Sequence, residues 1–275
     1  MSVMTPMKRA VLTGVCFALV TVIGTANVWA QTDEEFDKIY PFIGNWDGQV
    51  GSPTLQDRGN CGGRLGDYGE KLLNCTIPVG RLPLNARAEA WLKYMDARQS
   101  PSMADCQQIP YPAVLGEGSE IMAYPGRLEI RISSNPWFLY RTVWMNGTGP
   151  TPMPAQFFQH GFSRGHFDGN DLIIETDHFT FDPDGLDDHL HMASSTRKKL
   201  TERYTLIDKD NLRVTITLED PTFLTKPFKY AFLWTKIPRG GLQPVWVTCD
   251  PEVARNEVEF GYPGTKYQDP AETAK

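Results

Sequence analysis

The sequence predicts a mainly β protein, an antiparallel β-barrel or sandwich preceded by one short helix. Hydrophobic and polar residues alternate from Ser119 onward, as in residues 128–132, which is the period of a strand with one buried face. Two turn sequences, at residues 168–170 and 208–211, each separate two such runs and are typical of β-hairpins. Helical spacing is convincing only at residues 85–98.

The N-terminal 30 residues have the pattern of a secretory signal peptide. Lys8 and Arg9 form a short basic region, residues 10–26 are apolar apart from small or hydroxyl-bearing side chains, and residues 28–30 offer a small-residue cleavage site. The alternative is a membrane anchor, but the apolar stretch is at the short limit for a span and polar sequence follows at once. We therefore expect a periplasmic or secreted protein with no membrane span after cleavage of the signal.

The one amphipathic helix is expected at residues 85–98, inside a loop-rich segment that covers residues 31–118. Asn85 can cap its N-terminus, because an asparagine side chain accepts hydrogen bonds from the first backbone N–H groups of a helix. Ala88 and Trp91 then follow at the i, i+3 spacing that gives a helix one apolar face.

The β-barrel is expected over residues 119–255, followed by a C-terminal tail at 256–275. In the run at 212–218, Val214 and Ile216 should face one side and Thr215 the other, because side chains alternate along a strand. The strands are expected at residues 128–132, 137–145, 162–166, 172–176, 197–207, 212–218, 228–237 and 244–248.

Cysteine usage agrees with an exported protein. Cys16 leaves with the signal peptide, and the other four cysteines form an even set, which suggests two disulfides with three pairings open. The pairings that we favour are Cys61–Cys75, which closes a short loop, and Cys106–Cys249, which ties the end of the chain to its middle.

Acidic charge is concentrated in one part of the chain. The formal net charge of the 275 residues is −6, and residues 160–191 hold eight acidic residues with Arg164 as the single basic one. The same window contains all five histidines, and histidine both titrates near neutral pH and is the commonest metal ligand. Because no basic patch appears elsewhere, we expect a small-molecule ligand or substrate and no nucleic-acid partner.

Two stretches resemble a large family of uncharacterised exported bacterial proteins. Residues 160–176, HGFSRGHFDGNDLIIET, are similar to the signature G-H-S-x-G-x-W-E-G-x-x-L-x-x-E-T, and residues 201–228, TERYTLIDKDNLRVTITLEDPTFLTKPF, to a second run of that family. The resemblance covers roughly residues 85–255 and implies a lipocalin-like β-barrel, with no established activity to carry over. The chain departs from the pattern at Phe162, where the family has histidine, and in a longer acidic stretch that contains residues 182–191.

Four residues at the first hairpin are candidates for acid–base catalysis: His160, Arg164, His166 and Glu175. Even-numbered residues share one face of the strand, so His160, Arg164 and His166 line up. A histidine there could transfer a proton while Arg164 stabilises developing negative charge. The alternative is structural, with Arg164 paired across the hairpin to Glu175 or Asp168.

Five further residues are candidates for ligand binding: Trp144, Phe162, His178, Glu202 and Tyr204. Glu202 and Tyr204 share one face of a predicted strand, and a carboxylate in mid-strand is costly if it is buried without a partner. That cost indicates either a site carboxylate or a pair across the sheet. Trp144 and Phe162 would supply apolar surface to a pocket, or else simply belong to the core.

Residues 182–191 are a candidate metal site through Asp182, Asp184, Asp187, His189 and His191. Carboxylates at alternate positions around a glycine suit Ca²⁺, and two histidines two apart on a strand point to one face, as ligation of a transition metal needs. The alternative is a solvated acidic loop that is balanced by the basic residues after it. No dinucleotide fingerprint or phosphate-binding loop is present in the sequence, so no other cofactor is expected.

Three functions are compatible with these patterns. The favoured one is an exported β-barrel that binds a small, partly apolar molecule in a pocket with a few polar groups. The second is a cofactor-free lyase, isomerase or hydrolase that acts in the same pocket, and it requires His160, Arg164, His166 and Glu175 to converge around one cavity. The third is a metal-binding protein that uses residues 182–191.

Overall fold

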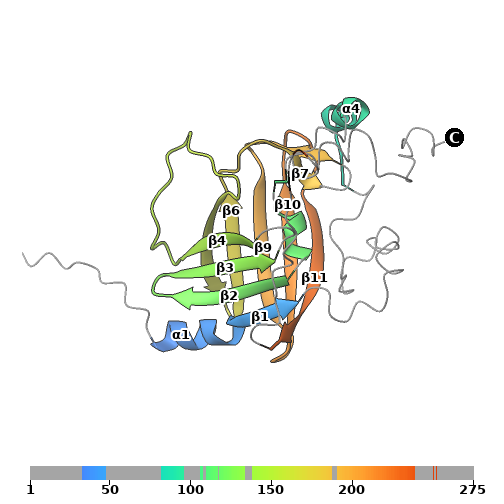
Figure 1. The fold of residues 1–275 in the computed structure, drawn as a ribbon. Helices are drawn as coiled ribbons and strands as arrows, with labels where there is room; N and C mark the ends of the chain where they lie inside the picture. Colours follow the sequence, from blue (N-terminus) through green and yellow to red (C-terminus); the bar gives the residue numbers. More distant parts are fainter. Residues whose placement is uncertain are drawn as a thin grey trace, which may run out of the picture.

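A computed structural model of the protein describes residues 33–47, 82–95, 106–107, 110–116, 118–133, 138–187, 191–238, 250 and 252. Its strands form one closed barrel and a separate two-stranded sheet (Figure 1). The mainly β prediction is therefore confirmed, and closure of the sheet identifies a barrel rather than a sandwich. The predicted signal peptide, the expected strand at 244–248 and the tail at 256–275 lie outside the described residues.

The helices are short and the strands are of ordinary length. In the described part of the chain, no helix is long and apolar enough to cross a membrane. The helical elements are α1 (Asp33–Ile39), η1 (Tyr40–Phe42), α4 (Ala86–Tyr94) and η3 (Ala113–Gly116). The strands are β1 (Gly44–Asp47), β2 (Gly118–Tyr124), β3 (Arg127–Ser133), β4 (Phe138–Met145), β5 (Phe162–Asp168), β6 (Asp171–Asp177), β7 (Asp182–Asp187), β8 (Met192–Ser194), β9 (Lys199–Leu206), β10 (Asn211–Glu219) and β11 (Phe228–Ile237).

Nine of these strands close the barrel in the order β1-β11-β10-β9-β6-β5-β4-β3-β2. All neighbouring pairs are antiparallel except β4 and β5, which run parallel. The parallel pair is short: residues 143–145 at the end of β4 pair with residues 163–165 near the start of β5, and residues 146–161 connect the two strands. Both predicted hairpins are present, since β5 pairs with β6 and β9 with β10.

Barrel closure depends on β1, which comes from the segment that was expected to be loop. Asn45 pairs with Ile237 of β11 on one side and with Glu120 of β2 on the other. Its four residues are too few to show a clear alternation in the sequence, which is why the pattern did not reveal a strand. Trp46 of β1 is fully buried, and its indole donates to the backbone oxygen of Phe42 at 2.8 Å.

Alternate residues of each strand fill the interior. In β10 the buried positions are Leu212, Val214, Ile216 and Leu218, so the predicted assignment of faces is confirmed. Larger side chains such as Trp234 complete the packing, and the indole of Trp234 donates to the backbone oxygen of Leu115 at 3.1 Å. The centre of the barrel is therefore packed with side chains, as in other small barrels.

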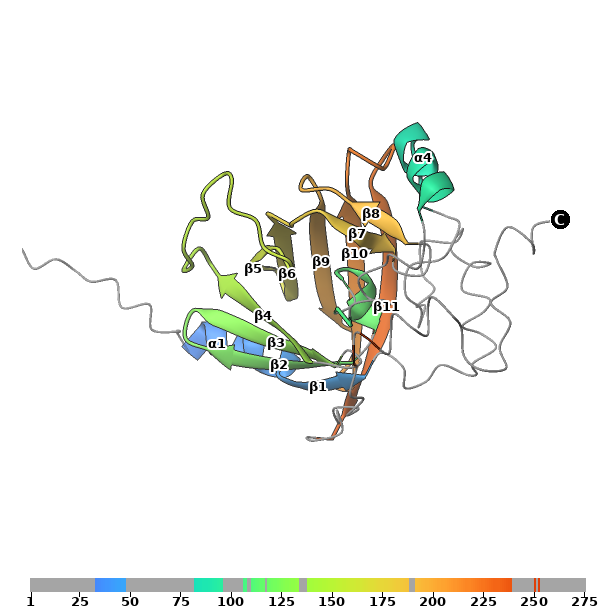
Figure 2. The same cartoon turned by 45° about the horizontal axis from the view of Figure 1, so that its top comes forward.

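The predicted helix is α4, and it ends earlier than expected. Asn85 caps it, because its side-chain oxygen accepts from the backbone N–H groups of Arg87 and Ala88 at 3.0 and 3.1 Å. The helix stops at Tyr94 rather than at residue 98, since Met95 already has an extended backbone. The helix packs against β8, and Figure 2 shows both beside β7 at one end of the barrel.

Candidate functional site

The interior of the barrel contains a buried ion pair between Arg141 of β4 and Glu202 of β9. The pair is bidentate, with Nη1 2.5 Å from Oε1 and Nη2 2.8 Å from Oε2. The hydroxyl of Tyr204 donates to Oε2 at 2.6 Å. The sequence analysis left Glu202 as either a site carboxylate or one member of a charged pair across the sheet, and the structure shows the pair. Glu202 and Tyr204 are fully buried and so belong to the core rather than to a ligand-contact surface.

The sequence analysis did not identify Arg141 as a buried residue, although its position in the strand pattern indicates one. It occupies an inward position between Leu139 and Val143, where a charged residue indicates a buried partner. Burial alone would lower the pKa of Arg141, but the carboxylate of Glu202 raises it above its ordinary value. Burial and Glu202 also raise the pKa of Tyr204, so the cluster holds a charged guanidinium and a protonated phenol.

Tyr111 and His160 form a second layer above this pair. The guanidinium of Arg141 lies 4.6 Å from the centre of the Tyr111 ring, and the rings of Tyr111 and His160 meet edge to face with centroids 6.1 Å apart. Burial raises the pKa of Tyr111. Burial and the positive charges of Arg141 and Lys198 lower the pKa of His160 to about 4, so this imidazole is neutral at pH 7.

The four candidate acid–base residues do not converge. Arg164 lies on the outer face of β5 with 39% of its side chain exposed, and His166 and Glu175 are also exposed. His160 is instead half-buried and packs on the ring of Tyr111. The structure therefore does not assemble the site that the catalytic hypothesis required.

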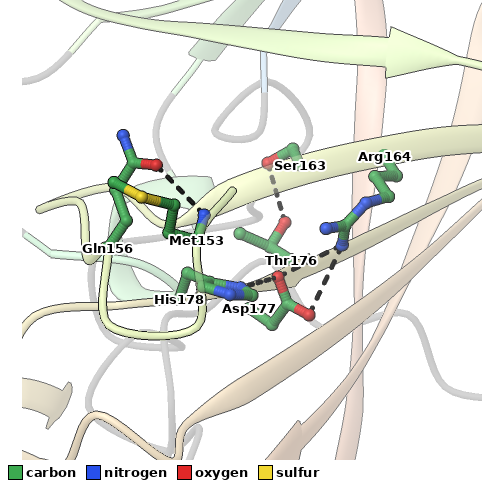
Figure 3. A network of polar contacts seen from close by, with 7 residues as sticks. All are labelled: Met153, Gln156, Ser163, Arg164, Thr176, Asp177 and His178. Atoms are coloured by element: carbon green, nitrogen blue, oxygen red, sulfur yellow. Dashed lines mark hydrogen bonds and ion pairs between the residues drawn. The ribbon is translucent and has the colours of Figure 1, made fainter. Parts of the chain in front are cut away.

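Arg164 and His178 do meet, at a carboxylate that the sequence analysis did not single out. Arg164 Nη1 lies 3.2 Å from Asp177 Oδ1, and His178 Nδ1 lies 2.6 Å from the same oxygen (Figure 3). The partner of Arg164 is thus neither Glu175 nor Asp168. A carboxylate in this position fixes the orientation of the imidazole, as it does beside histidines that transfer protons.

Trp144 and Phe162 lie outside the barrel interior. Val143 and Ser163 are paired, buried positions of β4 and β5, so the residues that follow or precede them, Trp144 and Phe162, point outward. The Ser163 hydroxyl lies 2.8 Å from that of Thr176 on the inner face. Trp144 packs against the returning loop so closely that a Cβ at Gly149 would lie 2.2 Å from its ring. Phe162 is covered by the Arg164 guanidinium at 4.7 Å, so neither aromatic residue lines a pocket in the barrel.

A cleft of about 590 Å³ opens beside the start of β7. This volume is in the range of small-molecule sites. Burial raises the pKa of Asp182 in its wall above the ordinary value. The lining residues are Cys106, Gln107, Gln159, Thr180, Phe181, Asp182 and Pro183.

Only Asp182 of these lining residues was a candidate from the sequence, where it was assigned to a metal site. The others are mostly neutral residues from three separate segments of the chain, and no spacing in the sequence marks them. The cleft adjoins the interior cluster, because Gln159 precedes His160 in the chain and Thr180 follows the buried Phe179.

The metal hypothesis involves the same segment. Asp184 Oδ1 lies 3.2 Å from His191 Nδ1, and Asp182 Oδ1 accepts from the backbone N–H of Asp184 at 2.9 Å. Within the described ranges, no group of three or more His, Cys, Asp or Glu residues is arranged to hold a metal ion. His189 and the side chain of Asp187 lie outside those ranges, so the five-residue site stays a prediction.

The predicted disulfides also stay predictions. Cys106 is buried, while Cys61, Cys75 and Cys249 lie outside the described residues.

Comparison with known proteins gives a structural likeness at low sequence identity. No family model and no curated protein matches the chain. Among solved structures, the crystal structure of a mutant of the fluorescent protein UnaG matches with 11% sequence identity and a TM-score of 0.32. The match covers 73% of this chain and 99% of that one. Membership of the exported family suggested by residues 160–176 and 201–228 remains a prediction.

Proposed function

We propose that the protein binds a small, partly apolar and uncharged molecule in the cleft beside β7, and that it does so in the periplasm or outside the cell. The observation that carries the proposal is the make-up of the cleft. Gln107, Gln159 and Thr180 supply hydrogen-bond donors and acceptors around the partly exposed ring of Phe181. This wall is more polar than apolar, so hydrogen bonds would fix the ligand while the Phe181 ring would supply its apolar contact.

The electrostatics favour an uncharged ligand. The described lining contains no basic residue, and Asp182 is its single carboxyl group. An anion would find no cation to pair with and would meet the acidic window at residues 160–191. The pKa of Asp182 is raised, mainly by burial, so this carboxyl group is also a poor partner for a cation.

The wall of the cleft is held in place before a ligand arrives. The ring of Phe181 packs edge to face on Trp91 of α4, with centroids 5.8 Å apart. Trp91 Nε1 in turn donates to the backbone oxygen of His191 at 2.9 Å. A wall that is already ordered loses little conformational entropy on binding, which favours affinity.

A fluorescence titration with N-phenyl-1-naphthylamine, a neutral and partly apolar probe, tests the proposal. We expect saturable binding by the wild-type protein and about fivefold weaker binding by Phe181→Ala, because an aromatic contact contributes about 1 kcal/mol. Tyr140→Ala is the matched control, since Tyr140 is 60% exposed and Phe181 51%. Absence of saturable binding, or an equal loss in both variants, would contradict the proposal.

Export is tested separately. Fractionation of cells that express the full chain should give a periplasmic or secreted form whose N-terminal residue is Gln31. Recovery of the intact chain from the cytoplasm would contradict export and leave the ligand proposal untouched.

A further inference from the structure

The cleft beside β7 presents hydrogen-bonding groups that the protein itself does not use. Gln107 and Gln159 are exposed residues of its wall, and Thr180 is a half-buried one. Within the described residues, no hydrogen bond joins these three side chains to another group of the protein. Since an amide carries both donors and an acceptor, the two glutamines offer paired hydrogen-bonding groups to a ligand.

Phe181 gives the same cleft a flat apolar surface. The residue is 51% exposed, although its ring is held edge to face against Trp91 with centroids 5.8 Å apart. An edge-to-face contact covers at most one face of a ring, so a face of Phe181 is left for a ligand. That face is the negative side of the ring quadrupole, which attracts C–H groups made slightly positive by a neighbouring oxygen.

This combination distinguishes among uncharged ligands. A hydrocarbon with a single hydroxyl would satisfy one polar group of the wall and place its apolar atoms against the others, which costs free energy at each. The polar groups come from residues 107, 159 and 180, in three separate segments, so they meet a ligand from more than one direction. A sugar ring matches this arrangement, because it carries hydroxyls around its rim and C–H bonds on its faces.

We propose that the cleft binds a neutral sugar, with a pyranose ring stacked on Phe181 and its hydroxyls hydrogen-bonded to Gln107, Gln159 and Thr180. This inference rests on the proposed function, whose ligand it assigns to the carbohydrates. Each amide can donate to one of two adjacent hydroxyls and accept from the other. At about 590 Å³ the cleft has ample room for a sugar ring.

The charges around the cleft select among sugars. The described lining contains no basic residue, so the carboxylate of a sugar acid would find no cation to pair with. It would also approach the acidic window at residues 160–191, to which Thr180, Phe181 and Asp182 belong. A neutral sugar avoids both costs.

Isothermal titration calorimetry with the methyl glycosides of D-glucose, D-galactose and D-mannose tests the proposal. Cyclohexanol, a ring of the same size with a single hydroxyl, and D-glucuronate, a sugar ring with a carboxylate, are the comparison compounds. We expect at least one glycoside to bind about tenfold or more tightly than either, because each further hydrogen bond contributes about 1 kcal/mol. Three glycosides that all bind no better than cyclohexanol would overturn the inference.

Two glutamine variants locate the site. Gln159→Met removes an amide from the wall, whereas Gln156→Met removes one from the same loop that lies outside the lining and accepts from the Met153 N–H at 3.2 Å (Figure 3). Binding of the glycoside should weaken about fivefold in the first variant, for the loss of about 1 kcal/mol, and stay unchanged in the second. Equal affinities in both variants would also overturn the inference.

Competition with N-phenyl-1-naphthylamine separates the two proposals. A bound glycoside should displace the probe, since both are expected to contact Phe181. Saturable probe binding that no glycoside displaces would leave the small-molecule function standing and remove the sugar. If neither the probe nor any glycoside binds, both proposals fail.

Discussion

Removal of one partner of the Arg141–Glu202 pair should be far more damaging than removal of both. Arg141→Met deletes two charge-assisted hydrogen bonds, of 2.5 and 2.8 Å, and leaves the Glu202 carboxylate buried with only the hydroxyl of Tyr204. Glu202→Gln leaves the guanidinium without a counter-ion. Since the exposed fractions of the two side chains are 2% and 0%, we expect each single change to lower the free energy of unfolding by about 3–5 kcal/mol.

The double variant Arg141→Met/Glu202→Gln holds no charge at this place and keeps an acceptor for Tyr204. We therefore expect it to be more stable than the sum of the single changes predicts, by at least about 2 kcal/mol. Urea unfolding, followed by tryptophan fluorescence, gives the free energy of unfolding of the wild-type protein, the two single variants and the double variant. If a single variant does not fold while the double variant does, the second change must have restored stability. That outcome still shows a favourable coupling between Arg141 and Glu202.

A surface pair supplies the control for this cycle. Arg127 Nε lies 2.8 Å from Glu129 Oε1, but the side chains are 41% and 21% exposed. Its coupling energy should be below about 1 kcal/mol, because solvent screens exposed ion pairs. Single changes at Arg141 and Glu202 that each cost less than about 1 kcal/mol, or that add without coupling, would refute the account of the buried pair.

Three further changes test other parts of the fold. The pKa of His160 is about 4 in the folded protein and 6.5 in the unfolded chain, so the folded state binds fewer protons between these pH values. The free energy of unfolding should therefore fall by about 3 kcal/mol as the pH drops from 6.5 to 4. Urea unfolding at several pH values should show a flatter pH dependence for His160→Asn, and an unchanged dependence would show that His160 is not its source. Asn85→Ala should cost about 1 kcal/mol in thermal unfolding through loss of the α4 cap, and no change would mean that water replaces the cap. Gly165→Ala should cost about 1–3 kcal/mol by urea unfolding, because the added Cβ would lie 2.5 Å from Met145 Sδ and 2.9 Å from Val143 Cγ1; a neutral outcome would mean that both side chains can move aside.

Local patterns predicted much of the barrel. The alternation in β10 and the turn residues of the two hairpins depend on neighbours in the chain, so a strand period and a turn type are enough to place them. The cap at Asn85 is equally local, since it acts on backbone groups two and three residues ahead. The helix end was less predictable, because the backbone of Met95 is extended even though its side chain suits the helical pattern.

The contacts that define the interior were not predictable in the same way. Arg141 and Glu202 are 61 positions apart, and which carboxylate meets which guanidinium depends on the order of the strands around the barrel. That order includes a parallel pair, β4 with β5, whereas the hairpin signals indicated antiparallel neighbours throughout. His160 and Arg164 illustrate the result, because strand parity placed them together while the backbone after His160 turns at Gly161, which has φ +70°, and separates them.

The closing strands impose an order on folding. Asn45 of β1 donates to the backbone oxygen of Pro238, 193 positions later in the chain. The strand β11 must therefore be available before β1 can be paired on both of its edges. Such distant contacts slow folding, because a long loop must be closed before its contacts stabilise anything. Until then β1 and β11 each present an unpaired edge on which another chain can add a strand. The newly made protein is therefore prone to aggregate until β11 is complete. Changes that weaken the pairing of β1 or β11 should lengthen this period.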